Sequence, residues 1–166
     1  MTPEELRNLR TRFCYTVEEA AYWIGETTIA VWQSYEDGKK PVPKEMAERM
    51  EMINLWFQAT VDSTAQHLRQ EPQAALITLI WYDDINDWLD TGHKFLFLWR
   101  AYLQVCLKLK EMFNDFIVLH RFDKDAFAAW VKENHLQDEP VDDNLTLRWA
   151  SETTLTTMAQ TPTTTQ

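Results

Sequence analysis

The sequence has few of the residues that indicate disulfides, metal sites or membrane spans. Its two cysteines, Cys14 and Cys106, belong to no CxxC motif or Cys/His cluster, which predicts free thiols rather than a disulfide framework or a zinc site. Residues 1–5 are polar and acidic, unlike a secretory signal, and the longest apolar stretch, residues 95–107, is too short to cross a bilayer. We therefore expect a soluble, cytoplasmic protein without a membrane partner.

Glycine and proline are also scarce, with three and six residues, which excludes collagen-like chains. Among the 166 residues, 45% are apolar and 13% aromatic, enough for the core of one large domain or two small ones. Basic residues number 16 against 26 acidic ones, and the net charge of −10 counts against a polyanionic partner. Residues 1–70, with eight basic and eleven acidic side chains (net −3), are the less repulsive part.

Helical periodicity predicts consecutive helices over residues 3–13, 16–24 and 27–37, and a fourth from Pro43 to about Arg69. Thr16 and Glu19 have the spacing of a capping box, and Gly25 is expected to end the second helix. The apolar face of the third helix is predicted to consist of Thr28, Ile29, Trp32 and Tyr35. The pattern breaks at residues 71–73, Glu-Pro-Gln, where we place a domain boundary.

Beyond this boundary the apolar period changes. It predicts strands over residues 75–81 and 116–122, helices that begin at residues 83, 96 and 123, and an acidic, threonine-rich tail without order over residues 138–166. The predicted fold class is therefore α+β, mostly α. It comprises a domain of four to five helices over residues 1–70, a small β-α-α-β-α domain over residues 75–135, and the tail.

The second and third helices, joined by a short turn with Gly25, match the expectation for a helix-turn-helix whose second helix lies in the major groove. Gln33 can form a bidentate pair with adenine, and Ala30 and the Thr27 methyl group can contact a thymine methyl group, which favours an A·T-containing site. The predicted base contacts are Thr27, Thr28, Ala30, Gln33 and Ser34, with Asp37 on the same outward face. The predicted phosphate contacts are Lys39, Lys40 and Lys44. Packed helix pairs occur in many all-helical proteins and do not by themselves indicate DNA binding. The alternative is therefore that this helix face and the lysines after it are simply exposed to solvent.

A family resemblance lies in Arg10, in residues 17–21 (Val-Glu-Glu-Ala-Ala), in Ile24-Gly25 and in residues 32–39 (Trp-Gln-Ser-Tyr-Glu-Asp-Gly-Lys). These residues resemble the lambda-repressor-like (XRE, Cro/C1-type) helix-turn-helix domains, and more narrowly the branch of YdiL-type proteins and anti-CRISPR-associated repressors. The resemblance is good over residues 3–58, weaker over 75–112 and absent from about 115 onward. It implies a dimeric repressor of its own operon that binds DNA through the N-terminal domain and pairs through the C-terminal one.

The resemblance also implies an ion pair between Arg10 and Glu36 that ties the first helix to the recognition helix. The chain departs from the branch at Glu26 and Ala30, where the branch can place arginine. No Lys or Arg occurs between Arg12 and Lys39. This departure weakens the DNA-binding interpretation at the face that would read the bases.

An apolar stripe at Trp99, Leu103 and Leu107 predicts a self-complementary dimer surface, and a small-molecule effector pocket lined by aromatic residues is the alternative. A symmetric dimer would bind a palindromic double-stranded operator.

Catalytic chemistry has little support in the sequence. Asp83, Asp84, Asp87 and Asp90 fit helix capping better than a metal site, and the four histidines are scattered outside known catalytic motifs. Cys14 is expected to be a small buried residue, with a redox sensor as the alternative. We therefore predict no enzyme, no metal and no cofactor. The preferred hypothesis is a homodimeric, sequence-specific DNA-binding regulator; the alternative is a protein-interaction or antitoxin-like module with the same fold and little DNA affinity.

Overall fold

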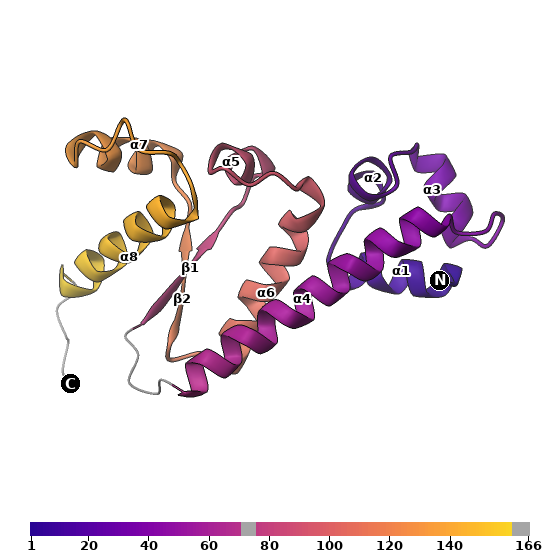
Figure 1. Ribbon diagram of the computed structural model, residues 1–166, viewed down its shortest axis with the longest axis horizontal. Helices are drawn as coiled ribbons and strands as arrows, with labels where there is room; N and C mark the ends of the chain where they lie inside the picture. The colour runs from indigo at the N-terminus through magenta and orange to yellow at the C-terminus, as the bar shows by residue number, and fades with distance from the viewer. Residues whose placement is uncertain (71–75, 161–166) are drawn as a thin grey trace. The chain divides into compact units, whose positions relative to one another are not determined.

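The computed structural model describes residues 1–70 and 76–160, and the chain divides into two compact units. The first unit contains Met1–Arg69 and Phe95–Val105, and the second contains Gln70–Lys94 and Cys106–Gln166. The described residues are mostly helical with one small sheet, which confirms the predicted α+β, mostly α class (Figure 1). The boundary predicted at residues 71–73 lies outside the described residues.

Four helical segments from the first part of the chain build the first unit. They are α1 (Pro3–Arg12), α2 (Val17–Glu19) with a π-helical continuation (Ala20–Ile24), α3 (Ile29–Glu36) and α4 (Lys44–Gln70). Thr2 with Glu5 and Thr16 with Glu19 form capping boxes, so side chains satisfy the free N–H groups at the starts of α1 and α2. Every predicted helix is present, and its observed ends lie close to the predicted ones.

The core of the first unit is formed by apolar side chains from all of these segments. It includes Leu6, Phe13, Ala20, Ala21, Ile24, Trp32, Met50 and Ile53. The predicted core position of Ile29 is wrong, because this side chain is 37% exposed. Ile29 is the first residue of α3, and its neighbours Thr28 and Ala30 are exposed as well. Helical spacing alone does not show that the first turn of α3 lies outside the core.

Residues 95–105 belong to the first unit, contrary to the predicted domain of residues 75–135. This segment contains a 3-10 turn (Leu96–Leu98) and the start of α6 (Trp99–Met112). The Tyr15 hydroxyl donates a hydrogen bond to the Phe97 carbonyl, and the Trp23 and Trp99 rings meet edge to face. Arg100 donates to both carboxylate oxygens of Glu19, at 2.6 Å for the closest pair of atoms. Glu19 thus caps α2 and holds α6 at the same time.

The second unit is built on two parallel strands, β1 (Ile77–Trp81) and β2 (Ile117–Arg121), with Ile77 opposite Ile117. Helix α5 (Ile85–Asp90) is capped by Asp84, and α7 (Lys124–Glu133) is capped by Asp123, as their positions predicted. Its core is aromatic. The ring centroids of Phe122, Phe127 and Trp149 lie within 5.6 Å of one another.

The predicted tail without order is wrong for α8 (Asp143–Gln160), which packs against β1. Its buried side chains include Thr146, Ala150 and Thr154, spaced four residues apart, together with Trp149. Threonine and alanine are small and weakly hydrophobic, so these buried positions produce no clear apolar period. In the sequence, the segment therefore resembles a polar, low-complexity tail. Residues 161–166 of the predicted tail lie outside the described residues.

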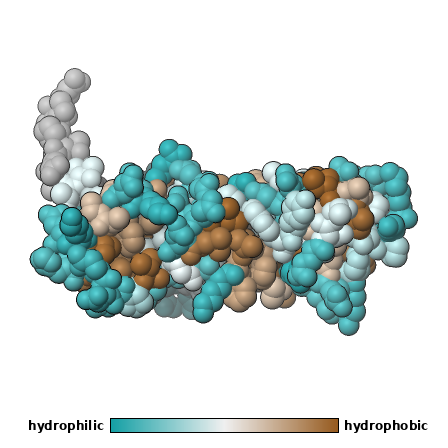
Figure 2. Space-filling view, turned by 90° about the horizontal axis from the view of Figure 1, so that it is seen from above, coloured by the Kyte–Doolittle hydropathy of each residue, from teal (hydrophilic) through white to brown (hydrophobic). Residues whose placement is uncertain are grey.

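Among the described residues, no helix combines the length and the apolar character needed to span a membrane. On the face drawn in Figure 2, hydrophobic side chains reach the surface between hydrophilic ones.

We expect Arg100→Ala to lower the free energy of unfolding by about 2 kcal/mol, because it leaves the largely buried Glu19 carboxylate without its cation. Urea unfolding followed by circular dichroism measures the change. Lys108→Ala is the control, since Lys108 pairs with Glu111 at the surface and its loss costs at most about 0.5 kcal/mol. Equal effects of the two substitutions would contradict the role given to Arg100.

Candidate nucleic-acid interface

Helix α3 presents a short polar face to solvent. Ala30 and Gln33 are exposed, and the Gln33 side chain has no hydrogen-bond partner among residues 1–70 and 76–160. The Thr28 hydroxyl accepts a hydrogen bond from the Val31 amide at 3.3 Å, and the Ser34 hydroxyl donates to the Val31 carbonyl at 2.6 Å. Within this predicted set, Gln33 is therefore the polar side chain that needs no rearrangement to contact a base edge, and Thr27 is half-buried.

A buried carboxylate sets the direction of α3. Glu36 is 7% exposed and accepts hydrogen bonds from Arg10 Nε at 2.6 Å, Arg10 Nη2 at 3.0 Å and Trp32 Nε1 at 2.7 Å. This is the ion pair that the resemblance implied. Burial alone would raise the pKa of Glu36, but the hydrogen bonds from Arg10 and Trp32 and the charges of Arg10 and Arg7 hold this pKa below its usual value. Glu36 is therefore a carboxylate at neutral pH and fixes α3 to α1.

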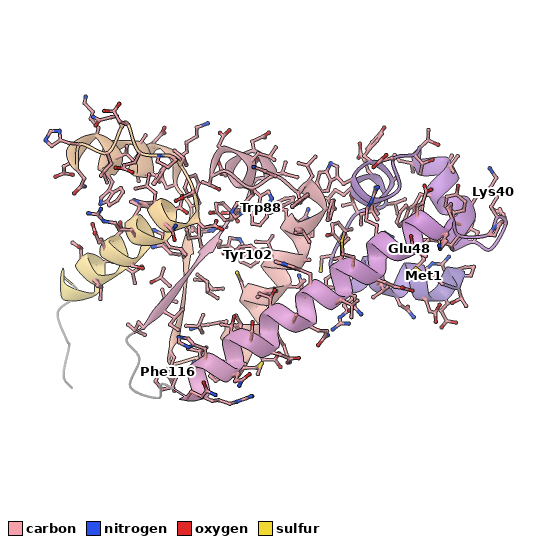
Figure 3. The ribbon with its side chains drawn as sticks, viewed as in Figure 1. Met1, Lys40, Glu48, Trp88, Tyr102 and Phe116 are labelled. Carbon is pink, nitrogen blue, oxygen red and sulfur yellow. The ribbon has the colours of Figure 1, made fainter. Side chains whose placement is uncertain are left out.

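The predicted phosphate-contact lysines lie around the loop that follows α3. Figure 3 shows Lys40 extending from this loop between α3 and α4. Lys39 forms an ion pair with Asp37 at 2.8 Å, and Lys44 pairs with Glu48 at 3.3 Å. Lys40 is exposed and has no ion-pair partner within the described part of the chain. The hydrogen bond from Lys39 and its charge lower the pKa of Asp37. Two of the three lysines thus already hold a carboxylate.

Two arginines that the sequence pattern did not point to lie close to α3 and to the turn before it. Arg7 Nη2 donates to the Glu36 carbonyl at 2.8 Å and lies 3.4 Å from an Asp37 carboxylate oxygen. Arg49, on α4, donates to the Ile24 carbonyl at 2.6 Å and pairs with Glu26 at 2.8 Å. Arg7, on α1, contacts the C-terminal end of α3, and Arg49, on α4, contacts the turn that precedes α3. Helical spacing gives no signal for either contact.

The predicted dimer surface is wrong for Trp99 and Leu103, which are 5% and 4% exposed within a single chain. Their stripe faces the chain's own core, and Leu107 alone of the three is exposed, at 44%. Cys14 was expected to be buried, but it is exposed and has a φ of 58°. It lies in the tight turn after α1, outside the helical core positions that its spacing suggested.

The aspartates around α5 serve the structure. Asp84 caps α5, Asp83 pairs with Arg121 at 2.9 Å and Asp90 pairs with Lys124 at 2.6 Å. In the part of the chain that the structure describes, no group of three or more His, Cys, Asp or Glu residues could hold a metal ion. A hollow of about 390 Å3 beside α8 is lined by Leu136, Pro140, Leu145 and Arg148 among others, none of them aromatic. It therefore does not match the aromatic effector pocket considered above.

Comparison with protein families gives a match of residues 1–115 to the model described as Aca2/YdiL-like. The matched range contains both sections of the first unit, Met1–Arg69 and Phe95–Val105. Comparison with curated proteins gives no match.

We expect Glu36→Gln to lower the free energy of unfolding at pH 7 by about 3 kcal/mol, since it leaves the mostly buried Arg10 without a counter-charge. The folded-state pKa of Glu36 lies below the ordinary 4.5, so the unfolded chain takes up this proton first as the pH falls. The stabilisation is therefore complete above pH 4.5 and is lost as the pH falls through the folded-state pKa.

Urea unfolding between pH 7 and pH 3 tests this expectation. The difference between the wild type and Glu36→Gln should shrink below pH 4.5, whereas Glu48→Gln, in an exposed pair, should change stability by at most about 0.5 kcal/mol. A difference that stays constant over this range would show that the charge of Glu36 is not what stabilises the unit.

Proposed function

Because the chain belongs to the Aca2/YdiL-like family, we propose that it is a sequence-specific DNA-binding regulator, a repressor whose helix α3 enters the major groove. The observation that carries the proposal is the polar face of α3, with Ala30 and Gln33 exposed on a helix that the Arg10–Glu36 ion pair holds in place. We propose no catalytic role for the chain.

Base reading is assigned to the exposed residues of α3. A glutamine side chain pairs bidentately with adenine N6 and N7, and the methyl group of Ala30 suits contact with a thymine methyl group. Thr27, Thr28 and Ser34 lie beside them. The hydroxyl groups of Thr28 and Ser34 must leave local hydrogen bonds or stay at the edge of the contact, and Thr27 is half-buried. These properties support an operator that contains A·T pairs.

Phosphate binding is assigned to Lys39, Lys40 and Lys44. Lys40 can bind a phosphate directly, whereas Lys39 and Lys44 must first leave Asp37 and Glu48. Phosphate contacts fix the register of a protein on DNA without reading its sequence. Lys40 should therefore contribute most to affinity among the three.

A protein-interaction or antitoxin-like module is the second candidate function. The net charge of −10 and the lack of a basic residue on α3 favour it. Such a module would select no sequence from a pool of randomised DNA duplexes, whereas a repressor would enrich a motif. Selection with the purified full-length chain at two salt concentrations is therefore the experiment that decides between the two functions.

We further propose that the chain acts as a homodimer, since a palindromic operator needs a two-fold protein. With Trp99 and Leu103 buried, the dimer surface must lie elsewhere than the predicted stripe. Sedimentation of the full-length chain measures the oligomeric state.

We expect Gln33→Ala to cost about 1–3 kcal/mol against the selected duplex and little against a scrambled one, because it removes a base contact. Lys40→Ala should weaken binding to both duplexes, because it removes a phosphate contact. It should also reduce the slope of the logarithm of the binding constant against the logarithm of the salt concentration by about one unit. Fluorescence anisotropy titrations at several salt concentrations measure both quantities. If both variants reduce the affinity for the selected and the scrambled duplex to the same extent, the division between base reading and phosphate binding is wrong.

We expect Ala30→Arg to tighten binding to all DNA and to move the preference toward guanine at one position per half-site, because arginine pairs bidentately with guanine O6 and N7. Ala30 is exposed, so the substitution leaves the core around Trp32 intact. Repeating the selection with this variant measures the new preference. If neither the wild type nor Ala30→Arg enriches a motif, the DNA-binding proposal is overturned.

A further inference from the structure

We propose that Arg49 is the positioning residue of the recognition helix: it holds the turn between α2 and α3 from the side of α4, and thereby aligns Ala30 and Gln33 for base reading. This inference rests on the proposed DNA-binding function. Arg49 would act without contacting a base, through the main chain of the turn.

The contacts of Arg49 reach the first half of this turn, at Ile24 and Glu26. Its guanidinium Nη1 donates to the Ile24 carbonyl at 2.6 Å. Ile24 ends the preceding helical segment, where carbonyl groups have no partner within the helix. Arg49 Nη1 also lies 2.8 Å from a Glu26 carboxylate oxygen. The Arg49 side chain is 29% exposed, so it joins these groups from a partly buried position on α4.

The backbone of this turn is unusual at Glu26, one of the two residues that Arg49 contacts. Glu26 has a φ of 47°, in the left-handed region that residues other than glycine seldom occupy. The preceding Gly25 has no room for a side chain, since an added Cβ would lie 2.9 Å from the Met46 methyl carbon and 3.0 Å from a Trp32 ring atom. On its core side, the turn is therefore held by close packing.

The other side of the turn is open. A hollow of about 170 Å3 separates the turn from Tyr35 of α3 and from the start of α4, and its lining includes Thr27, Pro43, Met46 and Arg49. The turn therefore lacks close packing on this side. Arg49 reaches the turn from the α4 side of this hollow, and the Thr27 amide donates to the Ala21 carbonyl at 2.9 Å. Arg49 is therefore the side chain that holds the first half of the turn from α4, next to a main-chain hydrogen bond that holds its second half.

The two contacts of Arg49 differ in strength. The Glu26 carboxylate is 74% exposed, and exposed ion pairs contribute little. The hydrogen bond to the Ile24 carbonyl is part-buried and involves a charged donor, so its loss leaves a main-chain acceptor without its partner. The hydrogen bond to Ile24 is therefore the contact that positions α3.

Three variants of the full-length chain separate these contacts. Arg49→Met keeps the apolar stem and removes both contacts; Arg49→Lys keeps one charged donor for the Ile24 carbonyl; Glu26→Gln removes the charge of the ion pair and keeps Arg49. Each variant is titrated against the duplex selected with the wild type and against a scrambled duplex, and its thermal unfolding is recorded.

We expect Arg49→Met to lower the ratio of specific to scrambled affinity about tenfold, the value of roughly one base contact. Arg49→Lys should recover part of this ratio, and Glu26→Gln should stay within about twofold of the wild type, as for an exposed ion pair. A role in stability alone would lower the melting temperature and reduce binding to both duplexes equally.

The outcomes distinguish this inference from the proposed function. If the wild type selects a duplex and Arg49→Met keeps its specificity ratio, or Arg49→Lys restores none of a lost ratio, the positioning role is overturned while DNA binding stands. If Glu26→Gln lowers the ratio as much as Arg49→Met, the ion pair positions the turn and the assignment to Ile24 is wrong. A wild type that selects no duplex overturns both proposals.

Discussion

The first unit depends on a carboxylate that has been taken out of water. Burying Glu36 costs free energy that only close, directed hydrogen bonds can offset, and Arg10 and Trp32 supply three of them. Because the guanidinium binds both carboxylate oxygens from a fixed planar fork, this ion pair favours one relative orientation of α1 and α3. The outward direction of Ala30 and Gln33 follows from this orientation. Base reading by α3 would thus be set from its buried side.

The same principle explains why the first unit is discontinuous in sequence. Glu19 uses its carboxylate both to cap α2 and to bind Arg100, which lies 81 residues further along the chain. Without residues 95–105, this largely buried carboxylate would have no cation, and Trp23 would lose the Trp99 ring. The family match extends to residue 115 and so includes the segment that completes the helical unit. A boundary near residue 70 agrees with one edge of the packed unit, but it leaves out residues 95–105, which belong to the same unit.

Local signals in the sequence were sufficient for most of the secondary structure. Thr16 with Glu19, Asp84 and Asp123 begin helices because their side chains satisfy backbone groups a few residues away, and such residues are visible in the sequence. Burial could not be predicted as well, because it depends on partners that are distant in the chain. An apolar stripe looks the same whether its own chain or a second copy covers it, as Trp99 and Leu103 show. In α8 the opposite happens, since its buried threonines resemble a solvated tail.

The charges around α3 indicate how an acidic chain could bind DNA, which is itself a polyanion. Lys39 and Lys44 each face a carboxylate, so a phosphate that binds one of them replaces one ion pair by another and releases a carboxylate that then repels it. The net gain from such an exchange is small, and salt weakens the old and new pairs alike. Lys40 has no such competitor among the described residues. Non-specific affinity of the proposed interface would then be low, and recognition would depend on correctly aligned base contacts more than on charge.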